Sequence, residues 1–538
     1  MENNTTMSAP EPNSSYNGGG LHRLPMDFDK TDYSLAIALL GAGFLFWNLI
    51  HPVTWGAGIT LFAFLLCTLS LIYFHQVGIK QTRRSLICLL ILLLSALPFA
   101  LFDNWGIKFL NFWFTMAIYI YWICLSTDRQ LDRSLSSYII GDGFNQILLV
   151  PFNNFTCAPN SLKMVLRHNK NSKRLLSLGL GILIFLPLLI AVINLLISAD
   201  AAFERFMVNI YNLTRWDSFF NIVWQVLLGI PVAAYLFGLL YGNRRGRYTN
   251  KITTTAMDKL TLDLRLAPRL TIYSPLTTFN LVYFIFFVVQ ATYLFSALSG
   301  ALPDSFTYAE YARRGFFQLC AVAGINLGLI AFSHLVTKRG AGEEPTALRI
   351  QYLITSGFTI LLIITAFSKM LMYIQTYGLT PLRVYTSWFM LLLFFIFMVI
   401  IVRQLRRFNA SRWMIAGFIT LFMLLSYGNV DGLIARYNLD RYQNGSLSAV
   451  DYSVMLELSD AALPHLYEFY QTIDDTEPEG RTVKAEIRSL IAQHQEYSFY
   501  RGNNGSDFRD FNWQSYRAAQ ISRQIIAPEV SYSASDAR

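Results

Sequence analysis

Lys369 is the residue whose position most needs a chemical explanation, because it interrupts a long apolar segment. Tyr373 and Tyr377 follow it at four-residue steps, so a helix would carry one ammonium and two phenols on the same face. An ionised side chain inside a membrane costs about 3 kcal/mol on insertion scales. The pattern predicts either a binding site for an anionic group or a lysine whose stem reaches the membrane surface.

More charges stand beside apolar segments at the same predicted membrane boundary. Arg383 starts the segment after Tyr377, and a run from Glu310 to Arg314 precedes another one. Arginine can hold a phosphate or carboxylate through two parallel hydrogen bonds, but Glu310 and Arg314 can also form a local ion pair. We expect an outward-facing polar pocket for an anionic group, built from Lys369, Tyr373, Tyr377, Arg383, Glu310, Arg313 and Arg314.

The composition places these residues in a membrane protein. Of the 538 residues, 54% are hydrophobic and 14% are charged, whereas a soluble domain carries about 25% charged residues. Most apolar segments between Tyr33 and Gly428 reach the roughly 18 residues that cross a hydrocarbon core. A soluble enzyme is excluded, and we expect an all-α polytopic membrane protein.

Hydropathy predicts about eleven transmembrane helices, of which the short first segment is the least certain to cross fully. They are expected near residues 33–50, 55–74, 85–102, 109–126, 174–198, 218–241, 276–298, 315–336, 351–375, 382–402 and 412–429.

Basic residues set the predicted orientation, because Lys and Arg are concentrated in alternate loops. The positive-inside rule then places the N-terminus in the cytoplasm of a multi-pass protein of the cell (inner) membrane. Since topology accounts for the basic residues, membrane lipids are expected partners and nucleic acid is not.

Polar segments flank the predicted membrane domain, residues 33–430. Residues 1–32 are rich in Asn, Ser and Gly and are predicted to be a disordered tail. Residues 431–538 carry more acidic than basic residues and show helical periodicity. They are expected to form a small helical extramembrane C-terminal domain on the extracytoplasmic side, open to a protein partner. A short apolar run, 147–152, is predicted to be interfacial or re-entrant.

Motifs that carry common chemistries are missing from the sequence. It contains no Walker-type phosphate loop, no H-E-x-x-H, no G-x-S-x-G and no C-x-x-C, and its histidines are scattered singly. We therefore expect no cofactor and no metal site, name no catalytic residue, and do not favour an enzyme.

Two motifs carry a family resemblance. YAEYARRGFF, residues 308–317, and YIQTYGLTPLRVY, residues 373–385, resemble a bacterial multi-pass membrane family catalogued as a domain of unknown function, type 4173, related to type 4153. The resemblance covers roughly residues 170 to 450. It implies a prokaryotic multi-pass membrane protein and transfers no catalytic residue.

Three function classes remain open. A transporter or lipid- and envelope-handling protein would use the polar pocket to hold an anionic headgroup, and we weakly favour it. A membrane-embedded transferase or hydrolase at the outer leaflet would need Glu310 as a general base. A non-catalytic assembly or sensing protein would use the acidic C-terminal domain to recruit a partner.

Overall fold

The computed structural model describes residues 26–50, 55–133, 135–166, 216–299, 316–338, 345–500 and 507–533, together with isolated residues between 181 and 203. The described residues form helices joined by turns, with one isolated bridge between Ala267 and Thr337 and no strand. The expected all-α class is therefore confirmed.

Ten helices of the described part are long and apolar enough to cross a membrane, which confirms the polytopic architecture. They are α1 (Lys30–Leu49), α2 (Ala57–Gln76), α3 (Arg83–Ala96) continued by α4 (Pro98–Leu101), α5 (Trp105–Ser126), α11 (Trp216–Arg245), α13 (Arg269–Ser299), α15 (Phe316–Val336), α16 (Thr346–Tyr377), α17 (Pro381–Leu405) and α18 (Ala410–Tyr427). The expected span at 174–198 lies largely outside the described residues.

Several helices begin earlier than hydropathy indicates, because polar residues cap or extend them. Asp29 forms a capping box with Asp32, so α1 starts at Lys30 and includes part of the segment expected to be a disordered tail. Asn104 accepts a hydrogen bond from the backbone N–H of Ile107 and caps α5. Lys108, expected just before a span, therefore lies inside the first turn of α5.

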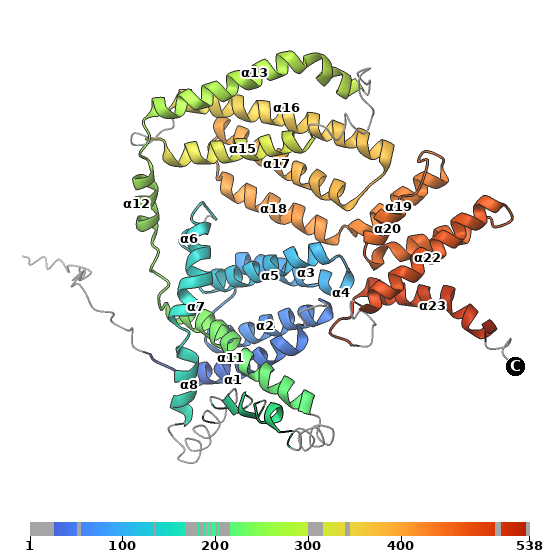
Figure 1. Cartoon of the computed structure of the whole chain (residues 1–538). Coiled ribbons are helices and arrows are strands. Elements are labelled where there is room, and N and C mark those ends of the chain that lie inside the picture. The colour runs from blue at the N-terminus through green and yellow to red at the C-terminus, as the bar shows by residue number, and fades with distance from the viewer. Residues whose placement is uncertain are drawn as a thin grey trace, which may run out of the picture.

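The long helices form two bundles that lie one above the other in Figure 1. The first bundle contains α1, α2, α3, α5 and α11, and the second contains α13, α15, α16, α17 and α18. Contacts between the bundles run through α5 and α18. We call this contact the seam.

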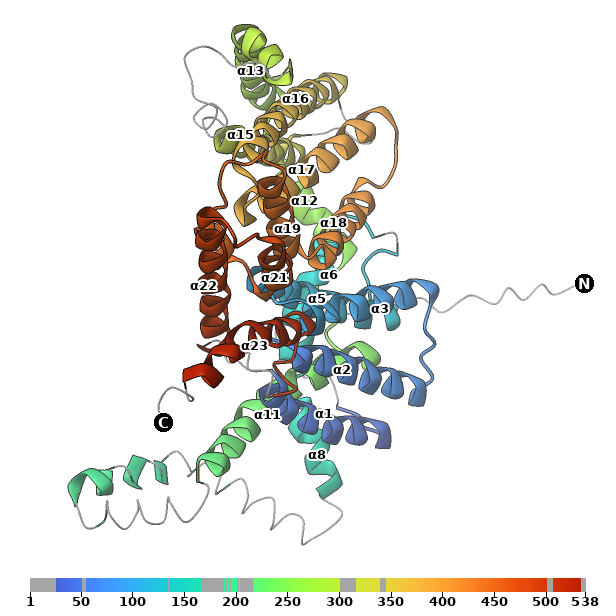
Figure 2. The same cartoon turned by 90° about the vertical axis from the view of Figure 1, so that its right-hand side faces the viewer.

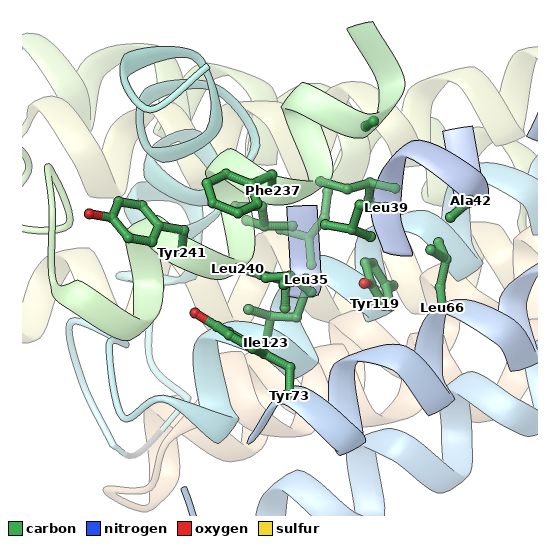
Figure 3. Close-up of a cluster of buried hydrophobic side chains, with 14 of the residues drawn as sticks. Leu35, Leu39, Ala42, Leu66, Tyr73, Tyr119, Ile123, Phe237, Leu240 and Tyr241 are labelled. Carbon is green, nitrogen blue, oxygen red and sulfur yellow. The ribbon is translucent and has the colours of Figure 1, made fainter. Parts of the chain in front are cut away.

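The first bundle is held by a close glycine contact. α1 and α11 pack against each other, and a Cβ on Gly229 would lie 2.6 Å from the carbonyl carbon of Gly43. Small residues at such a crossing let two backbones approach closely. Figure 3 shows the core beside it, in which Leu39 of α1, Phe237 of α11 and Ile123 of α5 converge.

A buried charge network closes one end of the first bundle. Arg244, in the last turn of α11, contacts Asp29 and the fully buried Asp32. Arg245 adds contacts of 3.2 Å to Asp29 and 3.1 Å to Asp32, and the Tyr73 hydroxyl donates to Asp32 at 2.7 Å. We call this end of the bundles, where α1 begins, the basic end.

Neutral hydrogen bonds tie the second bundle together. The amide nitrogen of Asn326 in α15 donates to Thr359 of α16 at 2.9 Å, and Tyr283 of α13 donates to the Asn326 amide oxygen. Thr355 of α16 donates to Asn280 of α13 at 2.9 Å. Three helices are thus joined by amide and hydroxyl side chains.

Short helices cover the basic end, at the left of Figure 1. They are α6 (Ile139–Phe144), the π-helix η1 (Asn145–Leu149), α7 (Val150–Asn153), α8 (Cys157–Leu166) and α12 (Thr254–Leu264). Ile140, Phe144, Leu148 and Phe152 are exposed at four-residue intervals, whereas Asp142, Gln146 and Val150 are buried. An apolar stripe of this kind suits a helix that lies in the membrane interface.

The opposite end carries a C-terminal module, at the right of Figure 1 and facing the viewer in Figure 2. It comprises α19 (Val430–Gln443), α20 (Tyr452–Glu457), the 3₁₀-helix η2 (Asp460–Ala462), α21 (Leu463–Thr472), α22 (Pro478–Tyr500) and α23 (Trp513–Ser533). Its core includes Ile434, Leu466 and Ile487, and it is continuous with Ile107 of α5 and Leu425 of α18. We call this end the module end.

Candidate functional site

Four of the residues expected to form an outward-facing pocket are described, and they lie toward the module end of α16 and at the start of α17. The Arg383 guanidinium lies over the Tyr373 ring, 4.1 Å from its centroid, and the rings of Tyr373 and Tyr377 are 5.3 Å apart. Lys369, one turn earlier in α16, is half-buried. The structure therefore brings Tyr373, Tyr377 and Arg383 together.

Arg383 also donates hydrogen bonds to the backbone at the turn between α16 and α17. It donates to the carbonyl of Tyr377 at 3.0 Å and to the carbonyl of Gly378. These carbonyls end α16, and a cation there satisfies acceptors that the helix leaves unpaired. The other expected members, Glu310, Arg313 and Arg314, lie outside the described residues.

A cavity lies elsewhere, at the basic end of the seam, with a volume of about 460 Å³. Its walls are mostly apolar and come from both bundles. Ile87 and Ile91 of α3, Ile118 of α5, and Ile415 and Ile419 of α18 line it, together with Ile139 of α6 and Ile147 of η1. A pocket of this size and polarity is typical of a site for a largely apolar ligand.

Three arginines line this cavity beside its apolar walls. Arg84 lies in the first turn of α3, Arg133 follows α5, and Arg412 lies in the first turn of α18. Arg84 donates to the backbone carbonyl of Arg133, which brings these two segments together. Arg133 also pairs with Asp128, where both side chains are exposed. The three arginines and the apolar walls together make the cavity amphipathic.

One acid faces the same cavity. Asp142 of α6 is buried and accepts a hydrogen bond from the backbone N–H of Leu131 at 2.8 Å. Burial raises the pKa of Asp142 to about 6, because desolvation disfavours the carboxylate. The net charge of the residues that line the cavity therefore depends on pH close to neutrality.

Aromatic side chains close the middle of the seam. The Phe114 ring of α5 lies 4.8 Å from the Phe422 ring of α18 and 6.4 Å from the Phe418 ring, measured between centroids. Phe114 and Phe422 are buried. On α5, Tyr121 and Ile118 line the cavity. Phe114 lies one turn closer to the N-terminus of the helix, and Lys108 lies in its first turn, beside the module end. These residues of α5 therefore line the seam from the basic end to the module end.

A second, much smaller cavity lies at the module end of the seam, with a volume of about 10 Å³. Lys108 and Asn111 of α5, Ser426 of α18 and Asp431 of α19 line it. Lys108 contacts Asp103 at 3.4 Å, and Asp431 accepts hydrogen bonds from the Asn104 amide at 2.9 Å and the Ser459 N–H at 3.1 Å. Burial raises the pKa of Asp431.

Sequence reasoning misses both seam cavities. Arg84, Arg133 and Arg412 belong to the basic loops that topology already explains, so nothing in the sequence separates them from other loop arginines. Lys108 falls in a predicted loop because the predicted span begins at residue 109. The polar residues Asn104 and Asn111, four and three positions from Lys108, are the only local signal.

A family model described as "Domain of unknown function (DUF4153)" matches residues 88–469. The match begins within α3 and ends within α21, so it contains α5, α18 and the seam. This family is type 4153, which the sequence resemblance gives as the relative of type 4173. No curated protein and no solved structure matches the chain.

Proposed function

Because this chain belongs to the DUF4153 family, whose description assigns no reaction, we propose a function from its own geometry: it handles a lipid with an anionic headgroup, bound in the seam cavity. The observation that carries this proposal is the cavity of about 460 Å³ whose apolar walls end at Arg84, Arg133 and Arg412. An acyl chain would occupy the apolar part, and the guanidiniums would hold a phosphate.

The position of the cavity between two bundles favours movement of a bound lipid over its simple storage. The cavity lies between two bundles, and Phe114, Phe418 and Phe422 separate it from the small cavity at the other end. A small rotation of α18 against α5 would separate these rings and connect the two ends. Movement of one bundle against another around a fixed site is a common route for membrane transporters.

The proposal includes the orientation of the protein in its membrane and its bacterial origin. With the basic end in the cytoplasm, the arginines of the cavity would face the inner leaflet, whose anionic lipids attract such residues. The C-terminal module would then be extracytoplasmic and the protein would reside in a bacterial inner membrane. A relation to type 4173 is retained here as a proposal based on the two sequence motifs.

The test measures lipid binding by the purified full-length protein in a neutral detergent. Phosphatidylglycerol and phosphatidylcholine with matched acyl chains are titrated and bound lipid is counted by native mass spectrometry. Replacing Arg84, Arg133 and Arg412 with Gln should weaken phosphatidylglycerol binding at least about tenfold, a loss of about 1.4 kcal/mol. Phosphatidylcholine binding should change less.

A matched control replaces three exposed arginines at the basic end of α17, namely Arg403, Arg406 and Arg407, with Gln. This variant has the same net charge change and should bind phosphatidylglycerol normally. Ala117→Trp fills the cavity without changing charge and should reduce binding of both lipids. Equal affinity in the wild type, the cavity-arginine variant and Ala117→Trp would refute the proposed site.

The outward-facing pocket of Lys369, Tyr373, Tyr377, Arg383, Glu310, Arg313 and Arg314 is retained as a second candidate anion site. It is supported by the stacking of Arg383 on Tyr373. Lys369→Met should reduce anionic lipid binding that persists in the cavity-arginine variant. Unchanged residual binding would assign Lys369 a structural role.

Two further expectations are carried as proposals. A protein partner for the acidic C-terminal module would be found by crosslinking in native membranes, with the module deleted as the control.

A transferase or hydrolase would require Glu310, so Glu310→Gln should abolish turnover of an added outer-leaflet phospholipid while membrane abundance stays unchanged.

A further inference from the structure

The segment that leads into α23 exposes three aromatic side chains, which we call the aromatic cluster. Phe508 is 61% exposed, Trp513 53% and Tyr516 42%. The rings of Trp513 and Tyr516 lie 5.9 Å apart, measured between centroids. In the described part of the C-terminal module, Leu433 is the only other large apolar side chain that is exposed. Exposed apolar side chains that gather in one short segment mark an interaction surface.

Hydrogen bonds seat this segment across the module ends of α1 and α2. The backbone N–H of Ala57, the first residue of α2, donates to the carbonyl of Phe511 at 2.8 Å. The N–H of Gly58 donates to the carbonyl of Arg509 at 2.9 Å. The Arg509 guanidinium donates to the carbonyl of Asn48, in the last turn of α1, at 3.1 Å. The segment thus supplies acceptors to the first N–H groups of α2, which has no side-chain cap.

The same segment reaches α5 and α18. The Gln514 amide oxygen accepts a hydrogen bond from the backbone N–H of Asp103 at 2.9 Å, and the Gln514 amide nitrogen donates to Asn429 at 2.6 Å. Asp103 lies just before α5 and Asn429 just after α18, and Figure 1 shows the start of α23 beside α4. Residues 509–514 therefore cross the ends of spanning helices from both bundles. Such helices end where the hydrocarbon core meets the headgroups, so the segment lies at the height of the membrane surface.

Aromatic residues of the spanning helices mark the same level. Trp105 begins α5 and is exposed, and its ring lies 4.8 Å from the ring of Trp55, two residues before α2. Trp47, in the last turn of α1, is exposed as well. Tryptophan and tyrosine are enriched at membrane–water interfaces, where an apolar ring meets polar headgroups. Trp513 and Tyr516 continue this belt from the spanning helices onto the C-terminal module.

We propose that the aromatic cluster of Phe508, Trp513 and Tyr516 inserts into the headgroup region of the membrane leaflet at the module end. The C-terminal module is then anchored twice, through hydrogen bonds to the ends of the spanning helices and through lipid. Continuity with the aromatic belt of α1 and α5 favours lipid over a protein as the occupant of this surface. Neutral lipid suffices, because aromatic rings make the contact.

The test measures the depth of a fluorophore on the full-length protein in phosphatidylcholine vesicles. Bimane is attached at Arg517→Cys, an exposed position one turn after Trp513 that leaves the aromatic cluster intact. The matched control carries bimane at Ala485→Cys, an exposed position of α22. Cys320→Ser is included in every variant, since the other four cysteines are buried. A nitroxide on the lipid near its headgroup quenches probes at the membrane surface, whereas iodide quenches probes in water.

The lipid nitroxide should quench the bimane at position 517 severalfold more strongly than the bimane at position 485. Iodide should show the reverse order. Equal quenching of the two probes by both agents would overturn the proposal. Protection of position 517 from both quenchers would show that a second copy of the chain covers the cluster, and this result would overturn the proposal as well.

Variants assign the effect to the aromatic side chains. Replacing Phe508, Trp513 and Tyr516 with Ser should lower the lipid quenching at position 517 severalfold, because the rings are lost while Gln514 and the backbone contacts of the segment remain. Leu433→Ser removes the other exposed apolar side chain of the module and should leave the quenching unchanged. Full lipid quenching in the triple variant would overturn the role of the cluster. The vesicles contain no anionic lipid, so failure here leaves the lipid-binding proposal to be judged by its own test.

Discussion

The two bundles are of similar size but are held together by different chemistry. In the first, α1 and α11 meet at a glycine contact and at ion pairs between Arg244, Arg245, Asp29 and Asp32. In the second, the described side-chain hydrogen bonds among α13, α15 and α16 are neutral, such as Asn326 with Thr359. A Cβ added to Gly324 or Gly328 of α15 would meet no atom within 4 Å.

This difference indicates a rigid first bundle and a more adaptable second one. Close backbone contact and buried charges tolerate little displacement, because each loses most of its stabilisation when the geometry changes. Amide and hydroxyl bonds between membrane helices contribute less, about 0.6 kcal/mol on average. We therefore expect α18 to move against α5, and four predictions test this contrast.

The largest effect is expected at the glycine contact. Gly229→Leu would force a side chain into the backbone of α1, where a Cβ alone lies 2.6 Å from the Gly43 carbonyl carbon. The variant should yield little monodisperse protein in size-exclusion chromatography after membrane extraction. Gly324→Leu in the second bundle should be tolerated, since open space surrounds its Cβ position. Equal yields from both variants would remove the contrast between the bundles.

A smaller but still large loss is expected from the charge network. Arg244→Ala leaves Asp32 buried without its closest cation, and breaking a buried pair costs about 3–5 kcal/mol. Unfolding in an SDS titration should shift accordingly. Replacing the more exposed Asp29 with Asn should matter less, because the buried Asp32 would keep its contacts with both Arg244 and Arg245. A larger loss for Asp29→Asn than for Arg244→Ala would contradict the assigned order.

The neutral ties of the second bundle should matter less. Asn326→Leu removes two hydrogen bonds, to Tyr283 and Thr359, and should lower the free energy of unfolding by about 1–2 kcal/mol. The same SDS titration measures it. If Asn326→Leu destabilises the protein as much as Arg244→Ala, the second bundle is as rigid as the first.

The smallest effect concerns pH at the seam. The pKa of Asp142 is raised to about 6 by burial, so this carboxylate loses its charge as pH falls through 6, where an ordinary carboxyl is still ionised. Phosphatidylglycerol affinity should rise severalfold between pH 7.5 and 5.5, because a negative charge beside the arginines disappears.

Asp142→Asn is the matched test of this pH effect. It should bind phosphatidylglycerol at pH 7.5 as tightly as the wild type does at pH 5.5, with no pH dependence. The raised pKa also means that the neutral carboxyl stabilises the folded state at low pH and that this contribution is lost as pH rises through 6. A wild-type pH profile retained in Asp142→Asn would assign the effect to another group.

The fold can be predicted from sequence because membrane spans are local features. Apolar runs of sufficient length and alternating basic loops depend on neighbouring residues only. Helix starts are less predictable, because Asp29 and Asn104 cap helices through contacts that hydropathy ignores. The span predicted near 109–126 therefore omits the first turn of α5, which contains Lys108.

The site is less predictable because its residues are distant in the chain. Arg84, Arg133 and Arg412 meet only because α3, α5 and α18 pack together, and no local pattern encodes that packing. Lys369 attracts attention because it interrupts an apolar run, yet half-burial near a helix end also suits a snorkelling side chain. Arg383 is identifiable in the sequence as a cation at a turn, and its bonds to the carbonyls of Tyr377 and Gly378 show a second, capping role.

The charge network of the first bundle also constrains biosynthesis. Asp32 and Arg244 are 212 residues apart in the chain. At a translation rate of about 5–20 residues per second, the ribosome needs about 10–40 s to deliver the arginine after the aspartate. For most of that interval α1 is already synthesised while its helical partner and counter-charge do not yet exist. Nascent α1 is therefore the segment for which we expect the greatest dependence on the insertion machinery.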